Sequence, residues 1–287
     1  MREFKGRTAV ITGGASGIGL AMANRFAEAG MNVVLADIEE SALAKAVESF
    51  EMRQSPVLGC VTDTMRKDSV EALCESAKDR FGNIHVLCNN AGVVSGGARV
   101  PIWEVSQSDW DWLMGVNFNG VLYGVQAFIP HMLGHGEPAH VINTASVAAF
   151  MPASGSYGVS KHGVLVLSED MHRDLAGTNV GVSVLCPGWV DTQIARAERN
   201  RPSSLKSAHN PDGAPLDVES ALKSGRQPAD IAAAVFDAIQ AEQFYILPHY
   251  GWDKVAVGRA AAIVARGAPY ELDIQALRDS ADASEDL

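Results

Sequence analysis

Cysteine is scarce in this chain of 287 residues, which holds only Cys60, Cys74, Cys88 and Cys186. They lie far apart and never form a C-x-x-C pair. This spacing argues against a zinc ribbon and against a thioredoxin-like redox motif. We therefore expect four buried free thiols in a protein of a reducing compartment.

Positive charge is also in short supply, since 23 lysines and arginines face 34 acidic residues and the net charge is −11. Nucleic acids and anionic membranes attract basic surfaces, so neither is an expected partner. Long apolar runs are missing too, both the roughly 18 residues of a membrane span and the shorter core of a signal peptide. We expect a cytoplasmic protein without a membrane segment.

No internal repeat and no low-complexity linker divides the chain, and 47% of its residues are hydrophobic. A single domain over residues 1–250 is the simplest organisation. Within it, residues 191–227 are rich in proline, serine and mixed charge, and they predict a long irregular flap that covers the substrate. Residues 251–287 are expected to form an extension, namely one helix and a solvated acidic tail.

Short apolar runs alternate with longer amphipathic stretches over the first 190 residues. The expected strands are 8–12, 32–36, 57–61, 84–88, 140–145 and 181–186, and the expected helices are 17–29, 39–51, 67–81, 110–132 and 157–175. After the flap follow a helix at 228–241, a strand at 244–247 and a helix at 252–265. This alternation predicts the α/β class, a Rossmann-type doubly wound parallel sheet of about seven strands with helices on both faces.

The sequence TGGASGIG at residues 12–19 follows the first strand and opens the first helix. Gly13, Gly17 and Gly19 permit a tight turn, a close approach of a pyrophosphate and close packing of strand and helix. The helix N-terminus then offers free N–H groups to the phosphates. The alternative is an ordinary strand-to-helix turn, but this context favours nucleotide binding.

Asp37 ends the second strand, about 20 residues beyond the glycines, where an acid binds the adenosine ribose. Such an acid also repels a 2′-phosphate, and the neutral Ser16 and Ile38 supply no basic partner for one. The charges thus favour NAD over NADP. Asp37 is alternatively the cap of the helix that follows.

Tyr157 and Lys161 stand four residues apart and share one helix face. A nearby ammonium group is expected to lower the pKa of the phenol and make it a general acid/base. Taken alone, such a pair is an ordinary surface contact. Ser146, however, follows a strand eleven residues earlier, at the edge where ligands bind, with Thr144 as the alternative hydroxyl. Asn117 interrupts a long helix, where a kink or a water site is expected.

Together these motifs resemble the short-chain dehydrogenase/reductase family, in its single-domain branch, over about residues 5–250. TGGASGIG, NNAG at 89–92, the tetrad Asn117, Ser146, Tyr157 and Lys161, and PGWVDT at 187–192 carry the resemblance. The cofactor-binding positions that it implies, taken with the residues above, are Gly13, Ser16, Gly17, Ile18, Gly19, Asp37, Ile38, Asp63, Thr64, Asn90, Ala91, Gly92, Tyr157, Lys161, Pro187, Gly188, Val190 and Thr192. The family usually has a longer interval between the serine and the tyrosine, so the loop at 150–156 is expected to reshape the substrate entrance.

The resemblance implies a mechanism. A hydride passes between the nicotinamide and a substrate carbon, while Tyr157 exchanges the hydroxyl proton. Lys161 holds the ribose and lowers the pKa of Tyr157, and Ser146 orients the substrate oxygen. Asn117 positions a water that links Lys161 to solvent. The resemblance also implies a homotetramer or homodimer, in which the 251–287 extension adds to an interface or closes a neighbour's pocket.

The substrate is expected to be a small-molecule alcohol or ketone that contacts Val147, Met151 and Trp189, since pockets favour apolar walls. The flap, the WDWLMGVN stretch at 110–117 and the YILPHYGW stretch at 245–252 are more loosely similar to the Cα-dehydrogenases of lignin β-aryl ether breakdown. That likeness suggests a bulky or aromatic secondary alcohol. Two alternatives remain, an NADP-dependent ketoreductase of the 3-oxoacyl or steroid type and a catalytically silent nucleotide-binding protein.

Two further clusters are expected to be structural. His131 and His135 lie four residues apart but have no evident third metal ligand, so no metal site is predicted. Trp103, Trp110 and Trp112 are expected to pack in the core.

Overall fold

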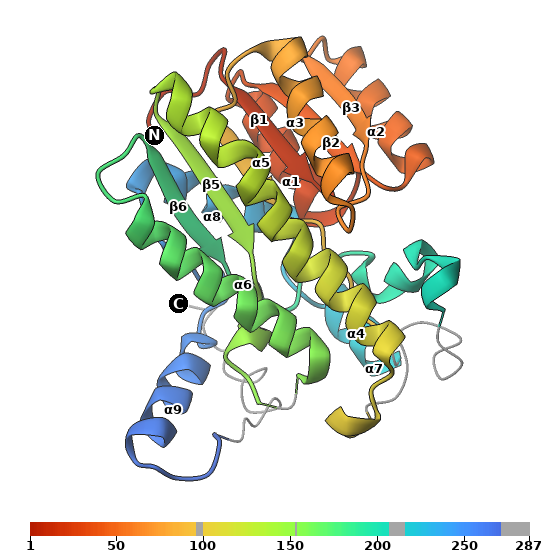
Figure 1. Cartoon of the computed structure of the whole chain (residues 1–287), viewed down its shortest axis with the longest axis vertical. Helices are drawn as coiled ribbons and strands as arrows, with labels where there is room; N and C mark the ends of the chain where they lie inside the picture. Colours follow the sequence, from red (N-terminus) through yellow and green to blue (C-terminus); the bar gives the residue numbers. More distant parts are fainter. Residues whose placement is uncertain (96–99, 153, 207–215, 271–287) are drawn as a thin grey trace.

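The computed structural model describes residues 1–95, 100–152, 154–206 and 216–270. Its centre is a seven-stranded sheet in the order β3-β2-β1-β4-β5-β6-β7, with every neighbouring pair parallel (Figure 1). The strands are β1 (Thr8–Thr12), β2 (Asn32–Asp37), β3 (Val57–Val61), β4 (Val86–Asn89), β5 (Ala139–Thr144), β6 (Val180–Leu185) and β7 (Tyr245–Ile246). The order reverses direction between β1 and β4, the point at which such sheets bind ligands.

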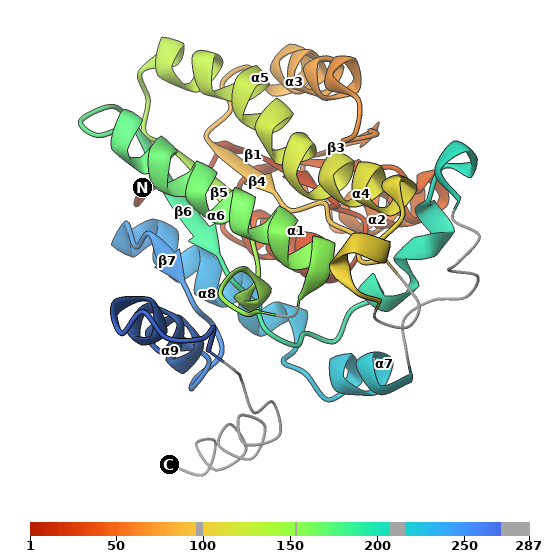
Figure 2. The same ribbon diagram turned by 60° about the horizontal axis from the view of Figure 1, so that its bottom comes forward.

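Helices cover both faces of the sheet, which confirms the predicted doubly wound architecture. One face carries α1 (Gly17–Glu28), α2 (Glu40–Met52) and α8 (Pro228–Ala241), and the other carries α3 (Lys67–Phe81), α5 (Gly120–His135) and α6 (Gly155–Asp174) (Figures 1 and 2). The central strands are buried on both sides, so most of their side chains are apolar, and the polar ones among them, such as His140 and Asn143 of β5, are buried as well. Figure 1 shows the arrowheads of β5 and β6 pointing toward the end of the molecule that holds α7 (Leu216–Lys223) and α9 (Asp253–Val264).

The predicted helix at 110–132 is longer and less regular than expected. It begins at Gln107 as α4 (Gln107–Met114), passes through one π-helical turn, η2 (Gly115–Asn119), and continues as α5 to His135. Ser106 caps its start by accepting a hydrogen bond from the N–H of Asp109. The expected disturbance at Asn117 is thus a π-turn, a feature that is frequent at functional sites.

The expectation of an irregular flap at 191–227 is wrong in part. The segment contains the 3-10 helices η4 (Ile194–Asn200) and η5 (Ser203–Leu205) and the helix α7. Arginines anchor the first two, as described below, which periodicity alone does not predict. The acidic tail at 271–287 lies outside the described residues.

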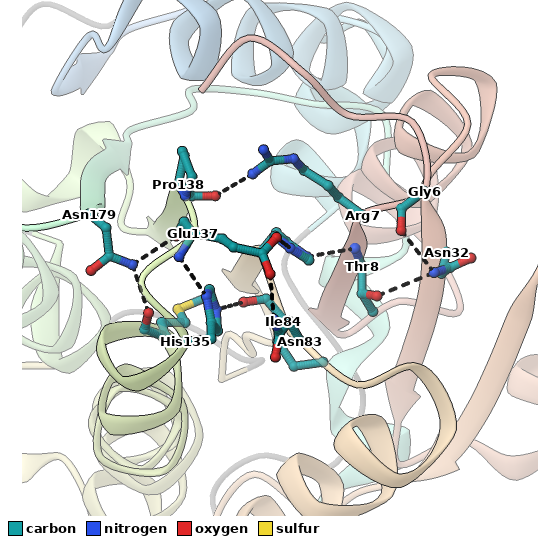
Figure 3. A network of polar contacts seen from close by, with 12 residues as sticks. Gly6, Arg7, Thr8, Asn32, Asn83, Ile84, His135, Glu137, Pro138 and Asn179 are labelled. Atoms are coloured by element: carbon teal, nitrogen blue, oxygen red, sulfur yellow. Dashed lines mark hydrogen bonds and ion pairs between the residues drawn. The ribbon is translucent and has the colours of Figure 1, made fainter.

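Histidine side chains connect the amino ends of the central strands (Figure 3). The site is expected at the other end of these strands, where their carboxyl ends lie. His85 accepts a hydrogen bond from the N–H of Thr8 at 3.1 Å and pairs with Glu137 at 3.0 Å. His131 and His135 bond the N–H and the carbonyl of Ile84. These bonds join Thr8 to His85, which precedes β4, and Ile84 to the two histidines of α5. Within the described residues there is no group of three or more side chains able to hold a metal.

The composition predicts four buried free thiols and no membrane segment. All four cysteines are free, but Cys60 is only half-buried. Among the residues that the structure describes, no helix is long and apolar enough to cross a membrane.

Candidate active site

A cavity of about 980 Å³ opens at the carboxyl ends of the parallel strands. It reaches from the glycine-rich turn after β1, past the ends of β2 and β3, to the first turn of α6. The cavity therefore occupies the crevice at the reversal of strand order, as expected for a nucleotide-binding sheet.

The glycine-rich turn is built so that larger residues do not fit. Gly13 has φ +64°, and a side chain there would meet the backbone of Ala91 at 3.0 Å. A side chain at Gly19 would lie 2.0 Å from the carbonyl of Gly13, so Gly19 packs the helix against the turn. Helix α1 then begins at Gly17, beside the cavity. Its free N–H groups fit the pyrophosphate of a dinucleotide.

Asp37 lies at the end of β2 and lines the same end of the cavity. Its two carboxylate oxygens accept hydrogen bonds from the N–H groups of Ala15 at 3.0 Å and Glu39 at 3.1 Å. These bonds fix the carboxylate next to the glycine-rich turn, where a ribose would lie. Asp63, after β3, similarly accepts from the N–H of Met65 and lines the cavity.

The NNAG segment ties β4 to the glycine-rich turn. The Thr12 hydroxyl accepts hydrogen bonds from the N–H groups of Asn90 and Ala91, at 2.9 and 3.1 Å. The Asn90 amide donates to the Thr12 carbonyl at 3.1 Å. Gly92 lies next to Lys161, since a side chain there would come within 3.4 Å of its Nζ. Asn90, Ala91 and Gly92 thus line the cavity between the glycine-rich turn and Lys161.

Tyr157, Lys161 and Ser146 meet at the other end of the cavity. Lys161 donates a hydrogen bond to the carbonyl of Thr144 at 2.8 Å, and its Nζ lies 5.8 Å from the centre of the Tyr157 ring. The Ser146 hydroxyl lies close enough to the phenol to oppose the rise of its pKa, and it donates a hydrogen bond to the carbonyl of Pro187 at 3.3 Å. Ser146 also accepts from the N–H of Ala148, which begins the short helix η3 (Val147–Ala149). A general acid/base, a cation and an orienting hydroxyl therefore lie together.

The charge states of this group depend mainly on burial. Loss of solvation raises the pKa of Tyr157 to about 12, although the Ser146 hydroxyl opposes the rise. Burial lowers the pKa of Lys161 to about 8. In the protein chain by itself the pKa of Tyr157 is therefore raised and not lowered as expected, because loss of solvation outweighs the effect of Ser146.

Asn117 is fully buried in the π-turn and uses its amide to hold the site together. Its Oδ1 accepts from the N–H of Val93 at 2.8 Å, and its Nδ2 donates to the Val93 carbonyl and to Ser160. Ser160 in turn donates to the carbonyl of Tyr157 at 2.7 Å. The side chain thus links the long helix to the Tyr157 helix, and its role through a water stays a prediction.

The PGWV segment after β6 forms one wall, and His249 holds it in place. The ring accepts a hydrogen bond from the N–H of Gly188 at 3.1 Å and donates to the carbonyl of Trp189 at 2.8 Å. Burial lowers the pKa of His249, which favours the neutral ring that these two bonds require. The sequence analysis missed His249, because a histidine beyond the last strand carries no motif.

An apolar cluster lines the same cavity as Tyr157. Val147, Met151, Trp189 and Trp252 pack together and all line the cavity. Trp252 belongs to the expected extension, so that segment contributes to the cavity of its own chain. Arg259 of α9 fastens it by donating to the carbonyl of Ala149 at 2.9 Å.

Most of the expected site residues line the cavity. They are Gly13, Ser16, Gly17, Ile18, Asp37, Ile38, Asp63, Thr64, Asn90, Ala91, Gly92, Ser146, Val147, Met151, Tyr157, Lys161, Pro187, Gly188, Trp189, Val190 and Thr192. Gly19 and Asn117 do not line it and act through packing and hydrogen bonds instead. Of the tryptophans expected in the core, Trp112 is buried, whereas Trp103 is 81% exposed.

Comparison with known proteins identifies the family. The pattern of the short chain dehydrogenases matches residues 7–203. The chain belongs to the short chain dehydrogenase family. A structure of a short chain dehydrogenase/reductase from Burkholderia phymatum in complex with NAD is 42% identical, with a TM-score of 0.90 over 95% of this chain and 99% of that one.

Two curated relatives are similar in sequence over most of their length. A 1-deoxy-11-beta-hydroxypentalenate dehydrogenase of Streptomyces exfoliatus is 38% identical over 84% of this chain and 82% of its own. A C alpha-dehydrogenase of Sphingobium sp. is 32% identical over 99% of this chain and 93% of its own. This short chain dehydrogenase is accordingly an oxidoreductase, of a family that binds nicotinamide cofactors and acts on small molecules.

Proposed function

We propose that this short chain dehydrogenase is an NAD-dependent enzyme that interconverts a bulky secondary alcohol and its ketone. The observation that carries the proposal is one continuous cavity, with the glycine-rich turn and Asp37 at one end and Tyr157, Lys161 and Ser146 at the other. A dinucleotide that occupied both ends of this cavity would be extended, with its nicotinamide at Tyr157.

The residues at the tyrosine end divide the chemistry among them. A bound nicotinamide supplies a hydride acceptor or donor at this end of the cavity. Tyr157 takes the hydroxyl proton of the alcohol as it becomes a ketone, or returns it in the reverse direction. Ser146 donates a hydrogen bond to the substrate oxygen and fixes its distance from the phenol. Lys161 binds the nicotinamide ribose, and its positive charge stabilises the phenolate.

Two features support NAD over NADP. The carboxylate of Asp37 is held at the ribose end by two backbone N–H groups, and it would repel a 2′-phosphate. Ile38, directly after it, is neutral and 42% exposed, so it offers such a phosphate no cation.

The walls near Tyr157 support a large apolar substrate. The apolar side chains of Val147, Met151, Trp189 and Trp252 pack together and line the cavity that Tyr157 also lines. The names of the two curated relatives, a dehydrogenase of a hydroxypentalenate and a Cα-dehydrogenase, point to hindered secondary alcohols. We assign this chain the same general class of substrate, and a homotetramer or homodimer as its assembly.

A panel of aliphatic, alicyclic, aryl and steroidal secondary alcohols tests the proposal, with NAD and NADP assayed side by side. Reduction of NAD by bulky or aryl alcohols is the expected result. Turnover with NADP alone would instead support the ketoreductase alternative. Binding of NADH without turnover of any alcohol or ketone would support the silent nucleotide-binding alternative.

A further inference from the structure

Two short helices form a strap, residues Ile194–Leu205 (Figure 2, teal), and several of its residues line the cavity. At the substrate end, the side chain of Arg201 is 1% exposed. Its Nη2 lies 2.7 Å from Asp109 Oδ1, as an ion pair without the alignment of a hydrogen bond, and its guanidinium stacks 4.8 Å from the Trp112 ring. Arg201 also donates to the Leu205 carbonyl at 2.7 Å. The strap is therefore stiff and firmly anchored at this end.

At the nucleotide end, a single side chain of the opposite wall holds the strap. Glu39 receives two hydrogen bonds from Arg199, at 2.5 and 3.1 Å, and one from Asn200 at 2.8 Å. Burial opposes ionisation of Glu39, but the bonds from Arg199 and Asn200 outweigh it and lower its pKa. The carboxylate is thus charged at neutral pH and binds the guanidinium in the bidentate geometry of a strong pair.

This contact lies directly beside the expected ribose site. The N–H of Glu39 donates to Asp37, and Asp37, Glu39 and Arg199 all line the cavity. Among the described lining residues, Arg199 and Lys161 are the only cations, and Lys161 lies at the far end. Arg199 is therefore the one arginine on the cavity wall within the described part of the chain, and Glu39 binds its guanidinium.

We propose that Glu39 is a second determinant of dinucleotide choice, which acts by binding Arg199 and so keeping the strap's only cavity-lining arginine from a 2′-phosphate. This inference rests on the proposed use of NAD. Asp37 repels a 2′-phosphate directly. Glu39 acts indirectly, because it binds Arg199, whose positive charge would otherwise attract that phosphate. The same contact ties the strap to the wall at the nucleotide end of the cavity.

Glu39→Gln tests the proposal, because the amide retains the size of the side chain but releases the charge of Arg199. Glu40→Gln is the matched control, since Glu40 is the next residue, exposed, and has no described partner in the strap. The double variant Glu39→Gln/Arg199→Gln asks whether the released arginine is responsible. Dissociation constants for NADH and NADPH are measured by the nucleotides' fluorescence, without substrate.

The expected result is a shift of about tenfold toward NADPH in the ratio of the two constants for Glu39→Gln, from the change of one charge near the phosphate. Glu40→Gln should leave the ratio within twofold, and the double variant should restore it. Trypsin provides a second readout, because Glu39→Gln should speed cleavage at Arg196 or Arg199 while Glu40→Gln should not.

Equal shifts for Glu39→Gln and Glu40→Gln would overturn the proposal, since they would reflect only net charge. A shift that persists in the double variant would overturn it as well, because Arg199 would not be the cause. Binding of NADH by the wild type with an unchanged ratio in Glu39→Gln would refute this inference alone. Failure of the wild type to bind either nucleotide would refute the proposed function and this inference together.

Discussion

Lys161 directs its ammonium group at the carbonyl oxygen of Thr144, 2.8 Å away. This bond fixes the lysine at the end of β5, within 5.8 Å of the Tyr157 ring centre. The ammonium group is buried and makes one described hydrogen bond, to the main chain. Because burial disfavours the charged form, the pKa of Lys161 is lowered to about 8. A polar partner such as a ribose hydroxyl would stabilise the charged form of Lys161. In the free protein, the charge of Lys161 is sensitive to mildly alkaline pH.

The affinity for NADH should therefore fall as the pH rises through about 8. Below this pH Lys161 is protonated in the free protein and attracts the nucleotide, whereas above it the charge is lost. Dissociation constants for NADH between pH 6.5 and 9.5 measure the effect. Lys161→Arg stays protonated throughout and should remove the dependence. An unchanged pH dependence in this variant would assign the titration to another group.

Removal of Trp252 should weaken the binding of large substrates selectively. The side chain is 5% exposed and packs with Val147 and Trp189 on the cavity wall. We expect Trp252→Ala to raise KM for bulky or aryl alcohols at least tenfold, as the loss of a buried aromatic contact implies, and to affect small alcohols less. Trp103→Ala is the control, because Trp103 is 81% exposed. A uniform loss of kcat for all alcohols would instead indicate a collapsed site.

The protein should lose stability in mild acid through His140. This ring is 2% exposed, is hydrogen-bonded to Ser183 at 2.7 Å, and has its pKa lowered by burial to about 3. The unfolded chain takes up the proton near pH 6.5, well before the folded protein does, so the stabilisation present above pH 6.5 is lost as the pH falls. At pH 5.5 the loss is about 1 kcal/mol.

Urea unfolding at pH 7.5 and 5.5 measures this loss. His140→Gln keeps a donor for Ser183 without a titrating ring, and its stability should depend less on pH than that of the wild type. His172→Gln, at an exposed position of α6, should retain the full dependence. Equal pH dependence in wild type and His140→Gln would contradict the assignment.

Elements with a strong local pattern could be predicted from the sequence almost to the residue. The helices at 67–81 and 228–241 match α3 and α8, because amphipathic periodicity and the proline at position 228 define them locally. The π-turn at Gly115–Asn119 was foreseen only as a disturbance. Its shape depends on hydrogen bonds from Asn117 to Val93 and Ser160, which lie 24 and 43 residues away.

In the candidate site too, residues in short motifs could be predicted, whereas contacts between residues far apart in the sequence could not. The glycine-rich turn, Asp37 and the Tyr157 helix carry their signals within short motifs. Glu39 and Arg199, by contrast, lie 160 residues apart, and only the fold brings them together. His249 and Trp252 belong to no catalytic or cofactor-binding motif, since their roles arise from contacts with the PGWV segment. Burial of Tyr157 could not be deduced from its spacing to Lys161, so the direction of its pKa shift was missed.

The central claim, that Tyr157 exchanges the substrate proton in an NAD-dependent reaction, is tested most directly with Tyr157→Phe. The variant keeps the ring and loses only the hydroxyl, so NADH should still bind with an affinity within about threefold of the wild type. Oxidation of the best alcohol should fall by at least about 10²-fold, as expected for loss of a general acid/base. Retention of turnover by Tyr157→Phe, with NADH binding intact, would contradict the account.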